Sequence, residues 1–248
     1  MKYIIKGEHG ELEIRFGALK GSSADITREF LKKLIHRIVI RSTEYYRKVK
    51  RLPGGLPDHA FPYREKQFHS IVCPSIADIT TCFLAEHPLK RKPAGEEEYP
   101  GNVDYWIFYK NYSFMMELKH SYFAYKEAEN PSKIIARRFS RALRQLEEIR
   151  IEECRSLTFG NGLRKIALET VVFYKSSKEK DKLMIDLKKE NFKMLFRKLL
   201  RNTELEKRSK FHALWILNRR LIEPFEYSDC FQIYPAVGFI GRVSETFG

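Results

Sequence analysis

The chain has 248 residues, a length that suits one large domain or two small ones. Hydrophobic residues make up 43% of it, which is enough for a sizeable core and excludes a largely disordered chain. Its 46 Lys and Arg against 32 Asp and Glu leave a formal net charge of +14, so polyanions are the preferred partners, with nucleic acid first and an anionic membrane surface second.

The cysteines argue against both a structural zinc site and a disulfide scaffold, because they are few, widely separated and without a C-x-x-C pair. They are Cys73, Cys82, Cys154 and Cys230. The apolar run at the start of the chain is too short for a signal peptide, and no stretch approaches the ~20 apolar residues that span a bilayer. We therefore expect a soluble cytoplasmic protein with reduced thiols and no membrane partner.

Residues 1–60 are predicted to form an N-terminal extension. Short runs over 2–6 and 11–17 predict a β-hairpin, and apolar residues that recur every four positions from Ile26 predict a helix. The Pro- and Gly-rich segment 51–60 is expected to end this part as a loop.

Residues 61–175 are predicted to form the central unit. Pro62 suits the first turn of a helix, aromatic and β-branched runs predict strands, and apolar residues at 3-4 spacing predict a long second helix. The expected order is helix, three strands, helix and strand, over residues 62–80, 81–92, 103–109, 112–121, 132–154 and 165–174.

Residues 176–248 are predicted to form a C-terminal helical extension that packs on the central unit, so that the whole chain makes one compact unit. Apolar stripes predict helices over 187–201 and 204–222, and short strands are expected within 230–243. Together these elements predict a mixed α/β fold.

The strands 103–109 and 112–121 are expected to pair as a hairpin with residues 110–111 at its tip. In that register Asp104 lies opposite Glu117, with Cβ atoms roughly 4.5–5.5 Å apart. The Lys-Asn tip is a weaker turn signal than Asn-Gly, and a slip of one residue would place the two carboxylates on opposite faces. Both registers stay open at this point.

Three side chains of this hairpin are candidates for a metal-binding catalytic site. Glu117 and Lys119 share one face of their strand because side chains alternate. Asp104 and Glu117 would repel each other across the hairpin, an arrangement that sheets normally avoid. A divalent cation between them would turn repulsion into ligation, and oxygen ligands of this kind suit Mg²⁺.

At these residues the sequence resembles the PD-(D/E)xK nuclease superfamily, whose members have a restriction-endonuclease-like fold. The signature is an acidic residue on one strand and a (D/E)-x-K triplet on the next, here Asp104 and then Glu117-Leu118-Lys119. The order of elements over 62–174 also matches the family core, which implies a central mixed sheet flanked by helices. Val103 departs from the proline that the family often has before the acidic residue, and the segments 1–60 and 176–248 lie outside the resemblance.

The resemblance implies a metal-dependent nuclease that hydrolyses phosphodiester bonds, with DNA favoured over RNA as the substrate, in restriction, defence, recombination or repair. Asp104, Glu117 and the backbone carbonyl of Leu118 would hold Mg²⁺ or Mn²⁺. Lys119 would hold or deprotonate the attacking water and offset charge on the phosphate. A homodimer would supply two such sites for cutting both strands.

The family also often adds a glutamate from the first core helix and a glutamine from the second. Glu65 and Gln145 are the candidates for these positions. Glu29 and Glu44 rank below Glu65 because they precede the 51–60 break. Glu65 is equally well explained as a solvated carboxylate in the first turn of a helix.

Arginines at i, i+4 and i+7 line one face of the second core helix, namely Arg137, Arg141 and Arg144, with Arg138 beside them. Arginines on such a stripe suit contact with phosphates, which positions nucleic acid without reading its sequence. A solvated helix face is the alternative, since four glutamates follow on the same helix.

Three other interpretations stay open. The Glu-x-Lys triplet could belong to an ordinary solvated hairpin, although the aromatic residues around it predict burial. A nuclease-like fold could serve as a non-catalytic nucleic-acid-binding or assembly subunit. A basic protein unrelated to nucleases could coat nucleic acid or an anionic membrane, and it would bind polyanions without metal or hydrolysis.

Overall fold

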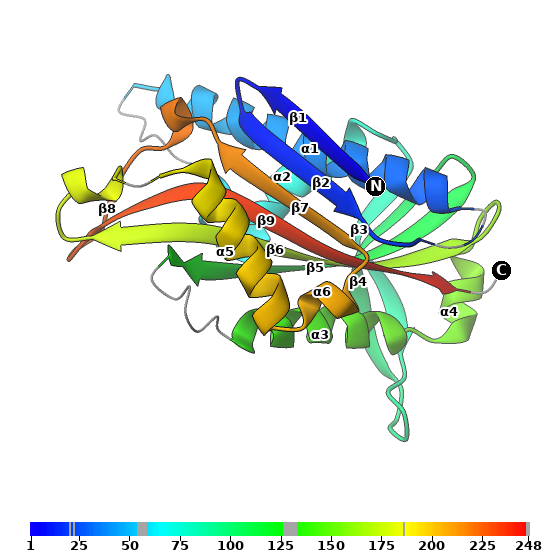
Figure 1. Cartoon of the computed structure of the whole chain (residues 1–248). Coiled ribbons are helices and arrows are strands. Elements are labelled where there is room, and N and C mark those ends of the chain that lie inside the picture. Colours follow the sequence, from blue (N-terminus) through cyan, green and yellow to red (C-terminus); the bar gives the residue numbers. More distant parts are fainter. Residues whose placement is uncertain (20, 22, 54–58, 126–132, 186, 247–248) are drawn as a thin grey trace.

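A computed structural model of the chain describes all residues except 20, 22, 54–58, 126–132, 186 and 247–248. Over the described residues a single mixed sheet of nine strands runs through the molecule, in the order β1-β2-β7-β9-β6-β5-β4-β3, with β8 paired to β9 (Figure 1). The strands are β1 (Lys2–Gly7), β2 (Gly10–Phe16), β3 (Phe83–Arg91), β4 (Tyr99–Tyr109), β5 (Tyr112–Ala124), β6 (Leu163–Ser177), β7 (Phe211–Leu217), β8 (Phe225–Glu226) and β9 (Phe231–Thr246).

Helices cover both faces of the sheet (Figure 1). They are α1 (Ala24–Lys50), α2 (Glu65–Ala77), α3 (Lys133–Glu147), α4 (Ile151–Ser156), α5 (Lys189–Asn202) and α6 (Leu205–Arg208), with short 3₁₀ turns at Asp181–Leu183 and Arg219–Leu221. The apolar faces of α1 and α2 pack on one face of the sheet, and those of α3 and α5 pack on the other. The predicted mixed α/β fold with a large, helix-flanked mixed sheet is confirmed.

The hairpin and helix expected near the N-terminus are present as β1, β2 and α1. The central elements also follow the expected order, as α2, β3, β4, β5, α3 and β6. β4 pairs antiparallel with β3 and β5, whereas β5 and β6 are parallel. Residues 54–58 of the predicted loop, and residue 132 at the predicted start of the second core helix, lie outside the described residues.

The prediction of a helical C-terminal extension is wrong in part. Residues 211–217, which we expected within a helix, form β7, and residues 231–246 form one long strand, β9, rather than several short ones. β7 lies between β2 and β9 and is buried on both faces, with Ala213 and Trp215 on the α1 side and Leu214 on the α5 side. An apolar run buried on both faces lacks the alternation of a half-exposed strand and is easily taken for a helix.

The long helix predicted over 132–154 is interrupted, because α3 ends at Glu147 and helical structure resumes only at Ile151, where α4 begins. There the backbone of Ile149 forms an isolated antiparallel bridge with Arg91, at the end of β3. Flanking hydrogen bonds run from the N–H of Lys92 to the carbonyl of Glu148 and from the N–H of Arg150 to the carbonyl of Lys90. The helix is interrupted because its backbone groups bond to a strand that is distant in sequence.

All four cysteines are free. Among the described residues, no helix combines the length and the apolarity needed to cross a bilayer.

Candidate active site

The predicted hairpin register is confirmed. β4 and β5 pair from Tyr109 with Tyr112 to Tyr105 with Met116, and both residues of the tip have the positive φ angles of a type I′ turn. The backbone pairing ends at Tyr105. Directly beyond it, the carboxylate of Asp104 accepts a hydrogen bond of 2.6 Å from the backbone N–H of Leu118.

Three carboxylates converge on the ammonium group of Lys119. Its Nζ lies 3.5 Å from Glu65, 3.7 Å from Glu117 and 3.8 Å from Asp104, and it donates a 2.8 Å hydrogen bond to the carbonyl of Leu118. The Lys119 side chain is only 11% exposed and that of Glu117 only 1%. The structure therefore brings together the four side chains and the carbonyl that the sequence singled out.

Glu117 has a second cationic partner that sequence reasoning missed. The buried guanidinium of Arg91 donates a 2.5 Å hydrogen bond to one Glu117 oxygen, and it also bonds to the carbonyls of Asn102 and Gln145. Burial raises the pKa of Glu117, the charge of Asp104 adds to this shift, and Arg91 and Lys119 oppose it. Alternation along β3 could have found Arg91, because it shares the buried face with Leu89.

Two residues of this cluster, Glu65 and Asp104, also belong to a candidate cation site. Glu65, His69 and Asp104 each offer one ligand atom, and these atoms lie within 4.8 Å of one another. Glu65 and His69 stand at i and i+4 on α2, on one face of the helix, a spacing that sequence reasoning did not use. His69 Nδ1 shares a 2.6 Å hydrogen bond with the hydroxyl of Tyr105, and a bond of this kind fixes the orientation of a ligating imidazole.

The donor set fits a divalent cation. Carboxylate oxygens suit Mg²⁺ and Mn²⁺, and an imidazole nitrogen suits Mn²⁺ better than Mg²⁺. The Leu118 carbonyl accepts a hydrogen bond from Lys119, which uses one of its two lone pairs and leaves the other for a ligand bond.

The cluster opens into a cavity of about 790 Å³ with α2 on one side and α3 on the other. Arg138, Arg141 and Gln145 contribute to its wall from α3, at i, i+3 and i+7. Gln145 Oε1 is buried and has no hydrogen-bond partner among the described residues.

Of the predicted arginine stripe, only Arg141 reaches this cavity. Arg137 and Arg144 line a neighbouring hollow of about 740 Å³ on α3, to which Arg138 and Arg141 also contribute. Glu29 and Glu44 do not line the site cavity. Glu29 pairs instead with Lys33 and Lys110, and Glu44 pairs with Arg41.

A further buried carboxylate lies one strand away from Lys119. Glu169 on β6 is the register partner of Lys119 in the parallel pairing, is fully buried, and has no well-formed hydrogen bond within the described part of the chain. Burial raises the pKa of Glu169 to about 8, and the nearby Ser121 hydroxyl and the charges of Arg138 and Lys119 oppose this shift. At neutral pH Glu169 is therefore mostly protonated. Its only sequence signal is a lone acidic residue in an apolar strand.

A scan against protein-family models and searches of curated proteins and of solved structures returned no match to this chain.

Proposed function

We propose that the chain is a divalent-metal-dependent nuclease that hydrolyses phosphodiester bonds, with DNA as its preferred substrate. The observation that carries the proposal is the convergence of Glu65, Asp104 and Glu117 on Lys119 beside an arginine-lined cavity. The order α2, β3, β4, β5, α3, β6, with β5 and β6 parallel, supports a restriction-endonuclease-like core.

Asp104, Glu65 and His69 would hold the cation, and one oxygen of Glu117 faces Lys119 at 3.7 Å. A bound Mg²⁺ or Mn²⁺ would lower the pKa of a coordinated water and polarise the phosphate. Arg91 keeps Glu117 in place by holding its other oxygen.

Lys119 is placed for two tasks. Its ammonium sits among the carboxylates with little exposure to solvent, where it can orient a water molecule and offset charge that develops on non-bridging phosphate oxygens. Arg138 and Arg141 face the same cavity and would contact the flanking phosphates, which orients the strand without reading bases.

One observation favours a second candidate, a nucleic-acid-binding subunit without catalysis. Arg91 and Lys119 already pair with Glu117, so this carboxylate has two cationic partners without a metal. Such a protein would bind DNA through α3 and would not cleave it.

A cleavage assay separates the two candidates. Labelled DNA and RNA are incubated with the wild-type chain in Mg²⁺, in Mn²⁺ or in EDTA, and the same series is run with Asp104→Asn and with Glu44→Gln. Glu44 is the matched control because it is an ion-paired carboxylate outside the cavity. We expect metal-dependent cleavage of DNA that Asp104→Asn abolishes and Glu44→Gln preserves. DNA binding without cleavage in either metal would instead establish the non-catalytic subunit.

A further inference from the structure

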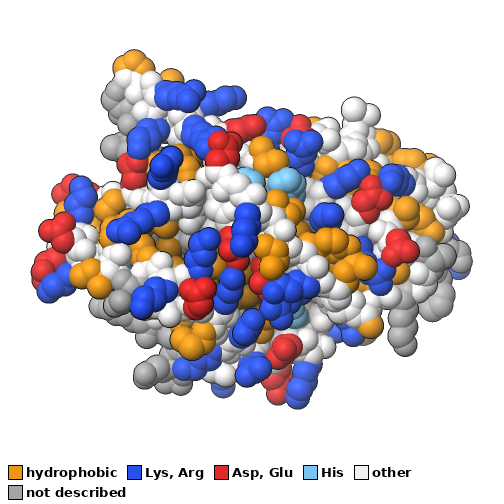
Figure 2. All heavy atoms as spheres, turned by 45° about the horizontal axis from the view of Figure 1, so that its top comes forward, with side chains coloured by type: hydrophobic (Ala, Val, Ile, Leu, Met, Phe, Trp, Pro, Cys, Tyr) orange, Lys and Arg blue, Asp and Glu red, His pale blue; other side chains and the backbone are white. Residues whose placement is uncertain are grey.

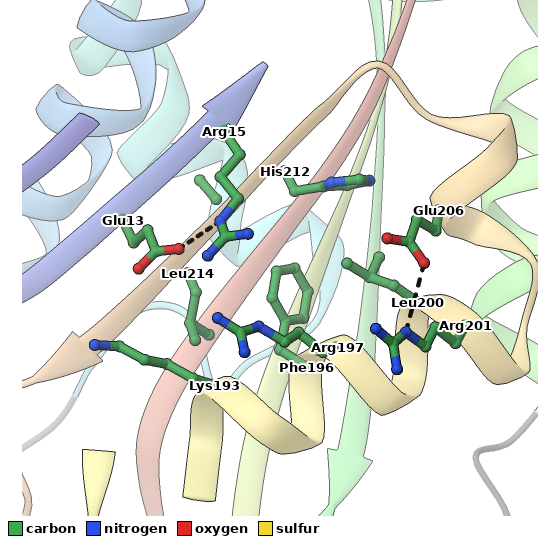
Figure 3. Close-up of a pocket in the computed structure, with 11 residues that line it drawn as sticks. Glu13, Arg15, Lys193, Phe196, Arg197, Leu200, Arg201, Glu206, His212 and Leu214 are labelled. Carbon is green, nitrogen blue, oxygen red and sulfur yellow. Dashed lines mark hydrogen bonds and ion pairs between the residues drawn. The ribbon is translucent and has the colours of Figure 1, made fainter. Parts of the chain in front are cut away.

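A second charged hollow lies between α5 and the strands β2 and β7, on the part of the chain that the nuclease resemblance does not cover. Its volume is about 400 Å³. Its cationic side chains are Arg15 from β2 and Lys193, Arg197 and Arg201 from α5 (Figure 3). Lys and Arg side chains are gathered over the face shown in Figure 2, with fewer carboxylates between them.

The three α5 cations stand at every fourth residue and therefore share one face of the helix. Between them Phe196 and Leu200 point into the hollow, and His212 and Leu214 of β7 complete the wall (Figure 3). Burial lowers the pKa of His212 to about 4, so its ring is neutral at pH 7 and adds no charge.

The carboxylates nearby do not neutralise these cations fully. Glu13 accepts a 2.5 Å hydrogen bond from Arg15 Nε and also faces Lys2 at 3.1 Å, so its charge is shared between two partners. Lys193 is paired with Glu11 at 2.6 Å. Glu206 lies 3.8 Å from Arg201 in a largely exposed pair, which contributes little.

Arg197 is the exception within the hollow, because it has no ion pair or hydrogen bond to any residue in the described part of the chain. Its guanidinium points toward the same space as that of Arg15 (Figure 3). Like charges that face a common hollow repel, and an anion between them would reverse this. Planar guanidinium groups match the oxygens of phosphate through paired hydrogen bonds.

We propose that this hollow binds a phosphate ester, with Arg15 and Arg197 contacting its non-bridging oxygens. Its volume lies in the range of small-ligand sites, and its wall combines cations with apolar side chains. The same chemistry is offered by a free nucleotide and by the backbone of a nucleic-acid strand. The proposal does not depend on the nuclease activity.

Isothermal titration calorimetry in EDTA tests the site. The probes are AMP, adenosine, which lacks the phosphate, and a 24-base-pair DNA duplex. The variants are Arg197→Gln and, as a matched control, Lys198→Gln, an exposed cation at the next position of α5 that does not line the hollow. EDTA prevents cleavage, so failure of the nuclease proposal would not affect the result.

We expect Arg197→Gln to weaken binding of a phosphate-bearing probe about 10- to 100-fold, the usual effect of losing a charge-assisted hydrogen bond, while Lys198→Gln leaves it within about twofold. Loss of AMP binding, with adenosine inert, identifies a free nucleotide as the ligand. Loss confined to the duplex identifies a nucleic-acid backbone. The proposal is overturned if Arg197→Gln and Lys198→Gln behave alike toward both phosphate-bearing probes.

Discussion

The candidate active site and the α5 hollow lie on one sheet and have opposite electrostatics. At β4 and β5, three carboxylates surround the single ammonium of Lys119. Between β2 and α5, Arg15 and Arg197 face a common hollow, and Arg197 has no carboxylate partner within the described residues. In the first arrangement three carboxylates share two cations, Lys119 and Arg91, which leaves an excess of negative charge that suits a cation. In the second arrangement Arg197 is left without a carboxylate in the described part of the chain, which suits a phosphate.

Within the active site, both burial and charged neighbours affect the pKa of a carboxyl group. Glu117 and Glu169 lie on adjacent strands and both are buried, yet Glu117 has Arg91 and Lys119 beside it while Glu169 has no well-formed hydrogen bond among the described residues. Burial raises the pKa of both carboxyl groups, to about 7 for Glu117, where Arg91 and Lys119 oppose the shift, and to about 8 for Glu169.

After the loss of cleavage in Asp104→Asn, the largest effect is expected from Lys119→Gln, which removes the ammonium and leaves all three carboxylates in place. Single-turnover cleavage should slow about 10²–10⁴-fold, the usual loss when a positioned proton-transfer or charge-stabilising group is removed. DNA affinity should change little. Lys110→Gln at the tip of the same hairpin is the control, and equal rates for the two variants would remove Lys119 from the chemistry.

Glu169→Gln should stabilise the protein in a pH-dependent way. The folded-state pKa is raised from 4.5 to about 8, so between these values the folded protein holds a proton that the unfolded chain releases, and wild-type stability falls as the pH rises. The variant lacks this loss and should gain about 2–4 kcal/mol in free energy of unfolding at pH 7. Urea unfolding at pH 5, 7 and 8.5 measures the difference, which should grow with pH, and a constant difference would contradict the account.

The arginines of α3 should differ in their effect on DNA affinity. Changing Arg138 and Arg141 together to Gln should flatten the slope of log K against log salt by about 0.9 per lost phosphate contact. The same change at Arg137 and Arg144 should have a smaller effect, because they line the neighbouring hollow and Arg144 is 69% exposed beside Glu148. Fluorescence anisotropy over a salt series measures both slopes, and identical slopes would mean that DNA does not enter the cavity.

The sequence was sufficient where local rules decide the structure. A two-residue turn fixes the β4–β5 register, and strand alternation then places Glu117 beside Lys119. The same logic of spacing along one helix could have found His69 from Glu65.

Long-range contacts account for what the sequence did not reveal. Arg91 reaches Glu117 because β3 pairs with β4, and Glu169 lies beside Lys119 only because β6 joins β5 in parallel. The break in the predicted helix at Ile149 likewise depends on its bridge to Arg91. β7 was mistaken for a helix because its burial on both faces follows from neighbours on distant segments, β2 and β9.

The most direct test of the account is a Mn²⁺ titration of the wild-type chain, of Asp104→Asn and of Glu44→Gln, followed by calorimetry or by the electron paramagnetic resonance signal of free Mn²⁺. The account predicts one Mn²⁺ site in the wild-type chain, a loss of at least about tenfold in affinity for Asp104→Asn, and no change for Glu44→Gln. Equal Mn²⁺ affinity in all three proteins, or no binding by the wild-type chain, would contradict a metal site formed by Glu65, His69 and Asp104 beside Lys119.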